Sequence, residues 1–470
     1  MKDVRRKSGD PAVNTLLIKA YRQQDEVIWD RMEAMQPQDG FGLLGLSCTH
    51  CYEGPCRVNP FDALDQETAC GMDRHDLAAN TLICRVQNGA SALLRLALDR
   101  KAAVSGSACK AACLAGDVMP CRDGLAASLA QAGHSIGGLL DALSSVRQPS
   151  GATRRLVVNM GALRADAANI MVIGHALPSA VASLMKAASA GTEAVNMLGV
   201  CGGEDLDLPL LTNYDSQELP LLTGAVDLVV YGSQCVMPAT LRLAGRLGIP
   251  VWCAADEPDA GAVNTALNNA LAHFRKRGPR ADIPVNTEQA TVWHGDLPPD
   301  MIEAVRAGCA AGTSKGLVYL GGCGNVRHTQ DAELVALAKA LLAEGYVVVS
   351  SGCVGTALAK AGLCNPDHGS VPGLPDTVAP VLHLGTCHNI RGILEFAASG
   401  AVPVYAVMPE LTQSKTLATA VALGTAGIPV FVSATAMPGL DARDTGNVLH
   451  PVEDFADFAQ TLARTAEHHR

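Results

Sequence analysis

The sequence predicts an α/β protein in which a helical N-terminal region precedes two doubly wound parallel sheets. Short apolar runs rich in valine and isoleucine alternate with helical patterns after residue 150, as in parallel βαβ units. Six of these runs end in a turn of small residues that carries a cysteine or histidine. Before residue 150 the apolar positions instead follow helical spacing.

Composition limits the classes of function. The chain has 470 residues, a formal net charge of -10 and 17% charged residues, and its basic run Arg5-Arg6-Lys7 is too short to follow a phosphate backbone. We therefore expect a globular protein that binds no nucleic acid. No apolar run is long enough to span a membrane and no secretory signal begins the chain, so we expect a cytoplasmic protein. In that reducing compartment we do not expect the sixteen cysteines to form a disulfide framework, and we expect many to be metal ligands and the rest small buried hydrophobic side chains.

The N-terminal region contains a compact set of four cysteines. Apolar spacing predicts one helix over residues 13–35, and a Gly/Pro-rich stretch then carries Cys48, Cys51, Cys56 and Cys70. Four thiolates from a tight loop suit a 4Fe-4S cluster. A structural zinc site also accepts four cysteines, but the paired C-x2-C spacing of zinc ribbons is absent, so we favour iron and sulfur.

A second group of cysteines lies in the alanine-rich stretch of residues 76–143, which we expect to be helical with a break near residues 116–120. Two of its members, Cys109 and Cys113, would share one face of a helix. These residues either bind a further cluster or are small buried hydrophobic side chains. The group comprises Cys84, Cys109, Cys113 and Cys121.

The turn-rich residues 147–151 predict a domain boundary, beyond which the periodicity changes to strands. We expect three domains, at residues 1–150, 151–312 and 313–470. In the second, the runs 169–173, 195–200 and 226–230 lead to His175, Cys201 and Cys235. In the third, the runs 317–320, 346–349 and 381–384 lead to Cys323, Cys353 and Cys387. Further strands are expected near residues 249–253, 402–407 and 430–432, and helices over residues 331–343 and 356–361.

Parallel sheets collect ligands at the carboxyl ends of their strands, so the six residues that follow these runs could surround one cavity. Five thiolates and one imidazole exceed what a single zinc ion or a simple cubane needs. They suggest a larger mixed cluster of iron and nickel. Lys415, before an Ala/Thr-rich helix, is either a solvated residue or a buried group that donates protons or stabilises an anion near the cluster.

Several stretches resemble the catalytic subunit of anaerobic nickel–iron carbon monoxide dehydrogenase and, more distantly, the hybrid cluster proteins. They comprise residues 37–42, 54–57, 223–227, 234–238 and 383–387. The resemblance implies a prismane/carbon monoxide dehydrogenase-like fold with two Rossmann-like domains. It also implies oxidation of CO with water to CO2, two protons and two electrons, a ferredoxin-like electron carrier and a homodimer.

The same resemblance assigns roles to residues. Cys48, Cys51, Cys56 and Cys70 would hold an electron-relay 4Fe-4S cluster. A Ni-Fe-S active cluster would be bound by the six residues that follow the strands, with Cys387 on nickel and with His175 and Cys201 on the outlying iron. Lys415 and His175 are the candidate catalytic residues. The metal ligands would be His175, Cys201, Cys235, Cys323, Cys353 and Cys387.

Some family positions are occupied by other residues in this chain. Asp39 and Ser47 stand where the family has cysteines that hold a cluster shared between subunits, so we expect no such cluster. The histidines proposed to move protons align with Leu93, Leu96, Asp99 and Ala102. Two alternatives remain open. One is a hybrid-cluster reductase of hydroxylamine or a similar nitrogen species, although that branch has a glutamate in place of Cys201. The other is a metal-cluster sensor or maturation protein without fast turnover.

Overall fold

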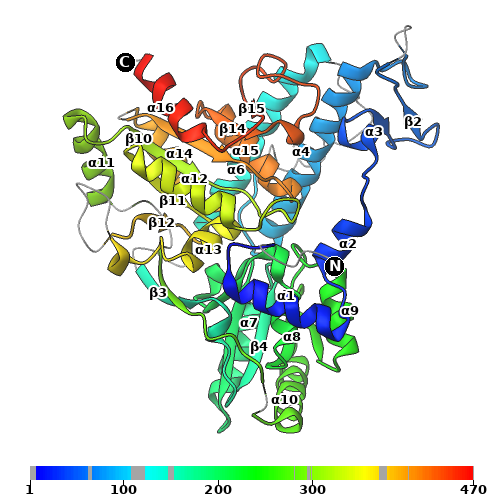
Figure 1. The fold of residues 1–470 in the computed structure, drawn as a ribbon, viewed down its shortest axis with the longest axis vertical. Helices are drawn as coiled ribbons and strands as arrows, with labels where there is room; N and C mark the ends of the chain where they lie inside the picture. Colours follow the sequence, from blue (N-terminus) through cyan, green and yellow to red (C-terminus); the bar gives the residue numbers. More distant parts are fainter. Residues whose placement is uncertain are drawn as a thin grey trace.

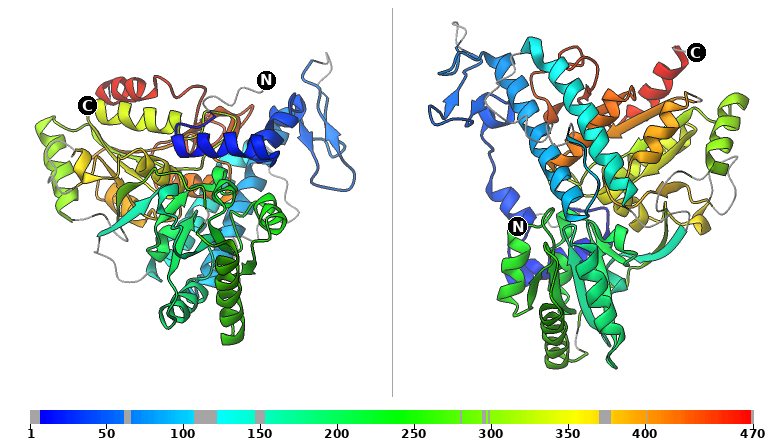
Figure 2. Two further views of the ribbon diagram at one scale, coloured as in Figure 1. Left: turned by 60° about the horizontal axis from the view of Figure 1, so that its bottom comes forward. Right: turned by 180° about the vertical axis from the view of Figure 1, so that it is seen from behind.

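The computed structural model describes residues 7–61, 66–106, 122–146, 153–279, 281–293, 297, 299–369, 378–400 and 402–468. Helices cover a large, strongly twisted sheet, and an N-terminal hairpin projects from the main body (Figures 1 and 2). Within the described residues no helix is long and apolar enough to cross a membrane.

The N-terminal helical prediction is partly wrong, because the stretch expected as one helix forms two. Helix α1 (Pro11–Gln23) ends where Gln24 adopts a left-handed conformation, with φ at 59°, and α2 (Ile28–Ala34) follows. A short helix, α3 (Gly40–Leu43), leads into the antiparallel pair β1 (Ser47–Cys48) and β2 (Cys56–Arg57). This pair lies in the projecting hairpin of Figure 2.

The predicted helical stretch after the hairpin is confirmed over its described parts, α4 (Arg74–Asp99) and α6 (Leu125–Ser145), with the 3₁₀ turn η1 (Arg122–Gly124) before α6. Both helices pack against α15 (Ser414–Thr425) from the far end of the chain. Glycines allow the close approach: a Cβ added to Gly89 would lie 2.1 Å from the Ser414 carbonyl oxygen, and one added to Gly133 would lie 2.0 Å from Thr425 Oγ1. Since Lys415 lies in the first turn of α15, the N-terminal helices fix the position of this lysine.

In the described part of the chain, one sheet of 13 strands has the order β15-β14-β13-β10-β11-β12-β9-β3-β6-β5-β4-β7-β8. All neighbouring pairs are parallel except β3 and β9, which pair antiparallel from Thr153↔Trp293 to Val158↔Glu288. The sequence predicted two sheets, and the β3–β9 pair joins them edge to edge. The first half contains β3 (Thr153–Val158), β4 (Ala168–Ile173), β5 (Val195–Val200), β6 (Leu210–Thr212), β7 (Val226–Tyr231) and β8 (Val251–Cys253). Strand β9 (Glu288–Trp293) pairs parallel with β12 and so forms the edge of the second half.

The second half is a doubly wound unit. Strands β11 and β12 follow β10 on one side, and the next strand, β13, lies on the other side of β10. This change of direction is where ligands collect in open α/β sheets. The strands are β10 (Gly316–Leu320), β11 (Tyr346–Ser350), β12 (Val381–His383), β13 (Val404–Met408), β14 (Val430–Ser433) and β15 (His450–Val452).

Helices and 3₁₀ turns connect these strands and cover the sheet (Figure 1). Buried aliphatic side chains fill the space between the layers, and one hydrophobic cluster extends from α4 and α6 into the second half of the sheet. The division into domains at residues 150 and 312 stays a prediction. The remaining connecting helices are α7 (Pro178–Ser189), α8 (Leu219–Leu222), α9 (Pro238–Arg246), α10 (Ala260–Arg277), α11 (Pro299–Ala311), α12 (Ala332–Ala343), α13 (Gly352–Lys360), α14 (Arg391–Ala398) and α16 (Phe458–His468).

Candidate metal centre

The six residues expected as cluster ligands follow the carboxyl ends of β4, β5, β7, β10, β11 and β12, as the sequence predicts. We call them the cage: His175, Cys201, Cys235, Cys323, Cys353 and Cys387. Every cage residue is at most 8% exposed. One detail differs, because α13 begins at Gly352, four residues earlier than predicted, so that Cys353 lies in the first turn of a helix.

Three cage residues of the first half-sheet converge closely. The ligand atoms of His175, Cys201 and Cys235 all lie within 4.8 Å of one another, and all three residues are buried. The Cys353 Sγ atom, from the second half-sheet, lies 3.8 Å from Cys201 Sγ. Both halves of the sheet therefore contribute sulfur to one small volume.

The other two cage residues are held beside this group by short contacts. The turn that carries Cys387 is tied to the start of α13 by a 2.7 Å hydrogen bond from the Gly352 amide to the Gly385 carbonyl. The Cys323 amide donates to the Glu410 carbonyl at 2.8 Å, and Cys323 Sγ lies 3.5 Å from Thr416 Oγ1 at the start of α15.

The backbone is strained where the first half-sheet supplies its cage residues. His175, Cys201 and Cys235 all have positive φ, at 56°, 39° and 55°. Residues with a Cβ seldom adopt this conformation, and it is found mainly where the surrounding structure imposes it for function. The three strained residues are the same three whose ligand atoms lie within 4.8 Å of one another.

A buried lysine, Lys415, lies beside the cage residue His175. Lys415 Nζ lies 2.5 Å from His175 Nε2 and 3.5 Å from Gln234 Oε1, and the residue is 4% exposed. Burial alone would lower the pKa of Lys415, but the thiolates of Cys235, Cys387 and Cys201 outweigh burial and raise it above its ordinary value. The lysine therefore stays protonated beside the sulfur atoms.

Thiol acidity within the cage is uneven. Contact with Cys201 lowers the pKa of Cys235, and the charge of Lys415 acts in the same direction. Contacts with Cys235 and Cys353, together with burial, raise the pKa of Cys201. Burial and the positive charge of Lys415 lower the pKa of His175, which keeps its imidazole neutral. A thiolate and a neutral imidazole are the forms that bind metals.

This donor set fits a metal cluster. The Nδ1 atom of His175 is buried and has no hydrogen-bond partner among the described residues, which is costly for an imidazole nitrogen unless a ligand occupies it. Five sulfurs and one imidazole suit iron and nickel better than oxygen-preferring ions. The cage therefore has the chemistry of a mixed iron, nickel and sulfur site.

Sequence reasoning missed four polar residues at the edge of the cage. Arg100 lies at the end of α4, Asp205 lies in the 3₁₀ turn η3 (Gly203–Leu206) after Cys201, and Thr386 and His388 flank Cys387. His388 could have been noticed from its place next to Cys387. No sequence pattern around Arg100 or Asp205 indicates a role at the site, because the two residues come into contact only in the folded chain.

Of the four residues expected to replace family histidines, three are apolar and buried and the fourth is an aspartate. Leu93 and Leu96 are at most 1% exposed and belong to the hydrophobic core, and Ala102 is also buried. Asp99 pairs with Arg95 at 2.7 Å on the same helix. None of these four residues is placed to pass protons to the cage through an imidazole.

Four cysteines in and after the N-terminal hairpin form a separate group, which we call the N-terminal loop: Cys48, Cys51, Cys56 and Cys70. Cys48 and Cys56 are paired across β1 and β2, and Cys48 is buried. Cys51 and Cys70 are exposed. Burial raises the pKa of Cys48. A backbone hydrogen bond opposes this shift, and the thiolates of the other three cysteines reinforce it.

The further cluster considered at Cys84, Cys109, Cys113 and Cys121 stays a prediction. The last three lie outside the described residues. Cys84 lies on α4, where burial and then the Cys48 thiolate raise its pKa.

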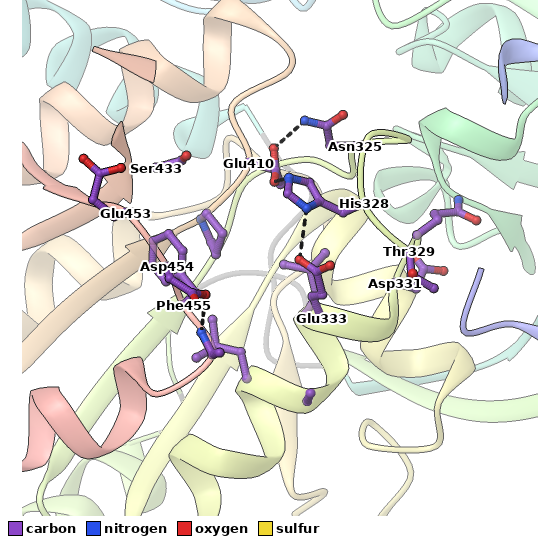
Figure 3. A pocket seen from close by; sticks show the side chains of 16 residues that line it. Asn325, His328, Thr329, Asp331, Glu333, Glu410, Ser433, Glu453, Asp454 and Phe455 are labelled. Atoms are coloured by element: carbon purple, nitrogen blue, oxygen red, sulfur yellow. Dashed lines mark hydrogen bonds and ion pairs between the residues drawn. The ribbon is translucent and has the colours of Figure 1, made fainter. Parts of the chain in front are cut away.

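A cavity of about 530 Å³ lies at the same edge of the sheet, beyond β10, β13, β14 and β15. Figure 3 shows His328 between Glu410 and Glu333, with which it pairs at 3.2 and 3.3 Å. None of the described residues that line it is a cysteine. The cavity is therefore distinct from the cage in its chemistry.

Comparison with known proteins agrees with this geometry. The sequence model of the Prismane/CO dehydrogenase family matches residues 111–450. This chain belongs to that family. Prismane/CO dehydrogenase relatives with curated names include carbon monoxide dehydrogenase 2 of Carboxydothermus hydrogenoformans, 26% identical over an alignment that covers 91% of this chain and 90% of the relative. Carbon monoxide dehydrogenase of Rhodospirillum rubrum is also 26% identical and covers 90% of each chain.

Among solved structures of the family, carbon monoxide dehydrogenase IV from Carboxydothermus hydrogenoformans superposes with a TM-score of 0.85 at 22% identity, covering 99% of both chains. At that level of identity the match shows the fold. The expected prismane/carbon monoxide dehydrogenase-like fold class is thus confirmed.

Proposed function

We propose that this protein is a carbon monoxide dehydrogenase that converts CO and water to CO2, two protons and two electrons. The observation that carries the proposal is the buried cage, in which the ligand atoms of His175, Cys201 and Cys235 lie together and Cys353 from the other half-sheet lies against Cys201. When bound there, a Ni-Fe-S cluster supplies metal ions that polarise CO and water and accept the electrons.

The side chains of the cage have separable roles in this proposal. Cys387 would hold nickel, His175 and Cys201 would hold the outlying iron, and Cys235, Cys323 and Cys353 would hold the remaining irons. Because all six are at most 8% exposed, the reaction takes place away from bulk water. A water-poor site strengthens every electrostatic interaction within it.

Lys415 is the proposed catalytic residue of the cage. Its protonated Nζ, close to His175 and to three thiolates, offers hydrogen bonds and positive charge to a carboxylate that forms beside it. We expect Lys415→Gln to lower the CO oxidation rate by roughly 100-fold to 1000-fold, the usual loss for one such donor. The control is Lys276→Gln on the surface helix α10, which should leave the rate unchanged. Wild-type activity in Lys415→Gln, at equal metal content, would contradict the assignment.

The N-terminal loop is the proposed electron exit, with a 4Fe-4S cluster on its four cysteines. Exposed apolar side chains adjoin it, with Leu44 at 54%, Tyr52 at 108% and Phe61 at 90% exposure. Such a surface suits a protein partner. We infer a ferredoxin-like carrier as the electron acceptor, a homodimer as the assembly and the cytoplasm as the location.

The deciding experiment measures CO oxidation with a viologen acceptor on protein purified anaerobically and loaded with nickel. We expect activity, together with nickel and roughly eight irons per chain from two clusters. Iron without nickel after loading would overturn the proposal and indicate a hybrid-cluster reductase.

Burial of Leu93 and Leu96 in the core favours one other candidate, a metal-cluster sensor or maturation protein without fast turnover. Such a protein would bind nickel and iron fully in the same assay but would not oxidise CO.

A further inference from the structure

A buried carboxylate joins the two loops that hold opposite ends of the cage. Asp205 follows Cys201 by four residues, and its Oδ1 and Oδ2 atoms accept from Thr386 Oγ1 at 3.0 and 3.1 Å. Thr386 directly precedes Cys387. The two residues are 181 positions apart in the chain and come from different halves of the sheet.

A cation from a third part of the fold completes this contact. Arg100, at the end of α4, donates from Nη1 to Asp205 Oδ2 at 2.8 Å. The same Nη1 lies 3.0 Å from His388 Nε2, which is 3.5 Å from Asp205 Oδ2. The side chains of Arg100 and Asp205 are only 8% and 7% exposed, and Thr386 and His388 are also buried.

Such an arrangement is rigid for electrostatic reasons. A buried carboxylate is stable only when charge and hydrogen bonds compensate it, so Asp205 cannot leave Arg100 and Thr386 without exposing an unpaired charge to a low dielectric. The contact therefore restricts the loop of Cys201 and the loop of Cys387 to one separation. A local hydrogen bond within either loop could not do this.

We propose that Asp205 is a positioning residue of the metal centre, which holds the loop of Cys201 and the loop of Cys387 at the separation that the bound cluster requires. This inference rests on the proposed function in assigning metals to the cage. Cys387 would bind nickel and Cys201 the outlying iron, so the carboxylate would set the spacing of the two metals between which CO and water react. Partners that orient metal ligands typically change metal affinity 10-fold to 100-fold when removed.

The test compares variants of one short segment in the full-length, metal-loaded protein. Asp205→Ala should lower the nickel-to-iron ratio and change the electron paramagnetic resonance spectrum of the cage cluster, while the signal of the N-terminal loop stays unchanged. Asp205→Asn keeps an acceptor for Thr386, so it should restore part of both properties. Asp207→Asn is the matched control, because Asp207 is 42% exposed and pairs only loosely with Arg154, at 3.4 Å.

A second pair of variants tests the same contact from the other loop. Thr386→Val removes the hydroxyl group and should reproduce the spectral change of Asp205→Ala, whereas Thr386→Ser should restore the wild-type spectrum. This pair decides the question if Asp205→Ala does not fold. A wild-type nickel-to-iron ratio and spectrum in both Asp205→Ala and Thr386→Val would overturn the inference.

The spectra also separate this inference from the proposed function. If the wild-type protein binds its cluster but does not oxidise CO, the proposed function fails. The positioning role of Asp205 is still judged by the variants' metal content and spectra.

Discussion

The cage and the N-terminal loop differ in how the fold holds their cysteines. The cage residues lie more than 200 positions apart at the extremes, follow six different strands and are all buried. The N-terminal loop comes from one short stretch of the chain, residues 48–70, and Cys51 and Cys70 are exposed. Assembly of the cage therefore depends on both half-sheets and on α15, whereas the loop depends on local turns. A change in one site should leave the other intact.

The strongest test of this independence is Cys235→Ser. We expect loss of the cage metals and a fall in CO oxidation of more than about 100-fold. The reason is that loss of a metal ligand should weaken metal binding more than loss of a residue that only orients a ligand. The four irons of the N-terminal loop should remain, as measured by metal analysis and electron paramagnetic resonance. Loss of all iron in this variant would show that the two sites are coupled.

The reciprocal test is Cys51→Ser, which changes an exposed cysteine of the N-terminal loop. It should remove about four irons per chain and leave nickel bound in the cage. Loss of nickel from Cys51→Ser would contradict independent assembly.

Gly89→Ala tests whether the cage depends on distant packing. The added methyl group would meet the Ser414 carbonyl, so α15 must shift, at a cost of about 1–3 kcal/mol in the free energy of unfolding. The shift should displace Lys415 and lower activity, while the iron of the N-terminal loop is unaffected. In the control, Gly137→Ala on α6, no atom lies within 4 Å of the new Cβ, so stability should rise slightly. Equal stability of the two variants in urea unfolding would rule out this packing effect.

The smallest expected effect concerns a buried acid near the cage. Asp215 lies in the 3₁₀ turn η4 (Tyr214–Ser216), and a Cβ on Gly324, next to Cys323, would fall 2.1 Å from its Oδ2. Burial, helped by Asp331 and Glu410 and opposed by Lys360, raises the pKa of Asp215 from 3.8 to about 7. Below pH 7 the folded chain keeps this proton and the unfolded chain releases it, so stability falls as pH rises toward 7.

Asp215→Asn removes that dependence. Relative to wild type, the variant should gain about 1 kcal/mol between pH 6 and pH 7, measured by urea unfolding at the two pH values. The exposed control Asp256→Asn, at 90% exposure, should show no such change. A pH-independent difference between Asp215→Asn and wild type would mean that Asp215 is ionised throughout this range.

The sequence predicts the parts of this fold that repeat a local pattern. Apolar runs followed by Gly-rich turns locate the strands and put the six cage residues at their carboxyl ends. The helix break at Gln24 escapes prediction because no glycine or proline marks it. The β3–β9 pairing also escapes, since antiparallel contact between residues more than 100 positions apart leaves no local signal.

The same distinction applies to the site. Cysteine and histidine can be recognised singly from their chemistry, so the cage could be proposed before the fold was known. Asp205, Arg100 and Asp215 are ordinary charged residues in the sequence, and their burial and partners exist only in three dimensions. Likewise, no sequence pattern distinguishes Gly89 from the other glycines, because its close contact with α15 exists only in the folded chain.

The positive φ angles of His175, Cys201 and Cys235 have a consequence for protein design. A left-handed conformation costs a residue with a side chain about 1–2 kcal/mol, and glycine avoids that cost. A redesign that optimises folding stability alone would therefore choose glycine at these three positions. Such a redesign would be more stable but would lose three proposed metal ligands. Any stabilised version of this protein should therefore keep these three residues unchanged.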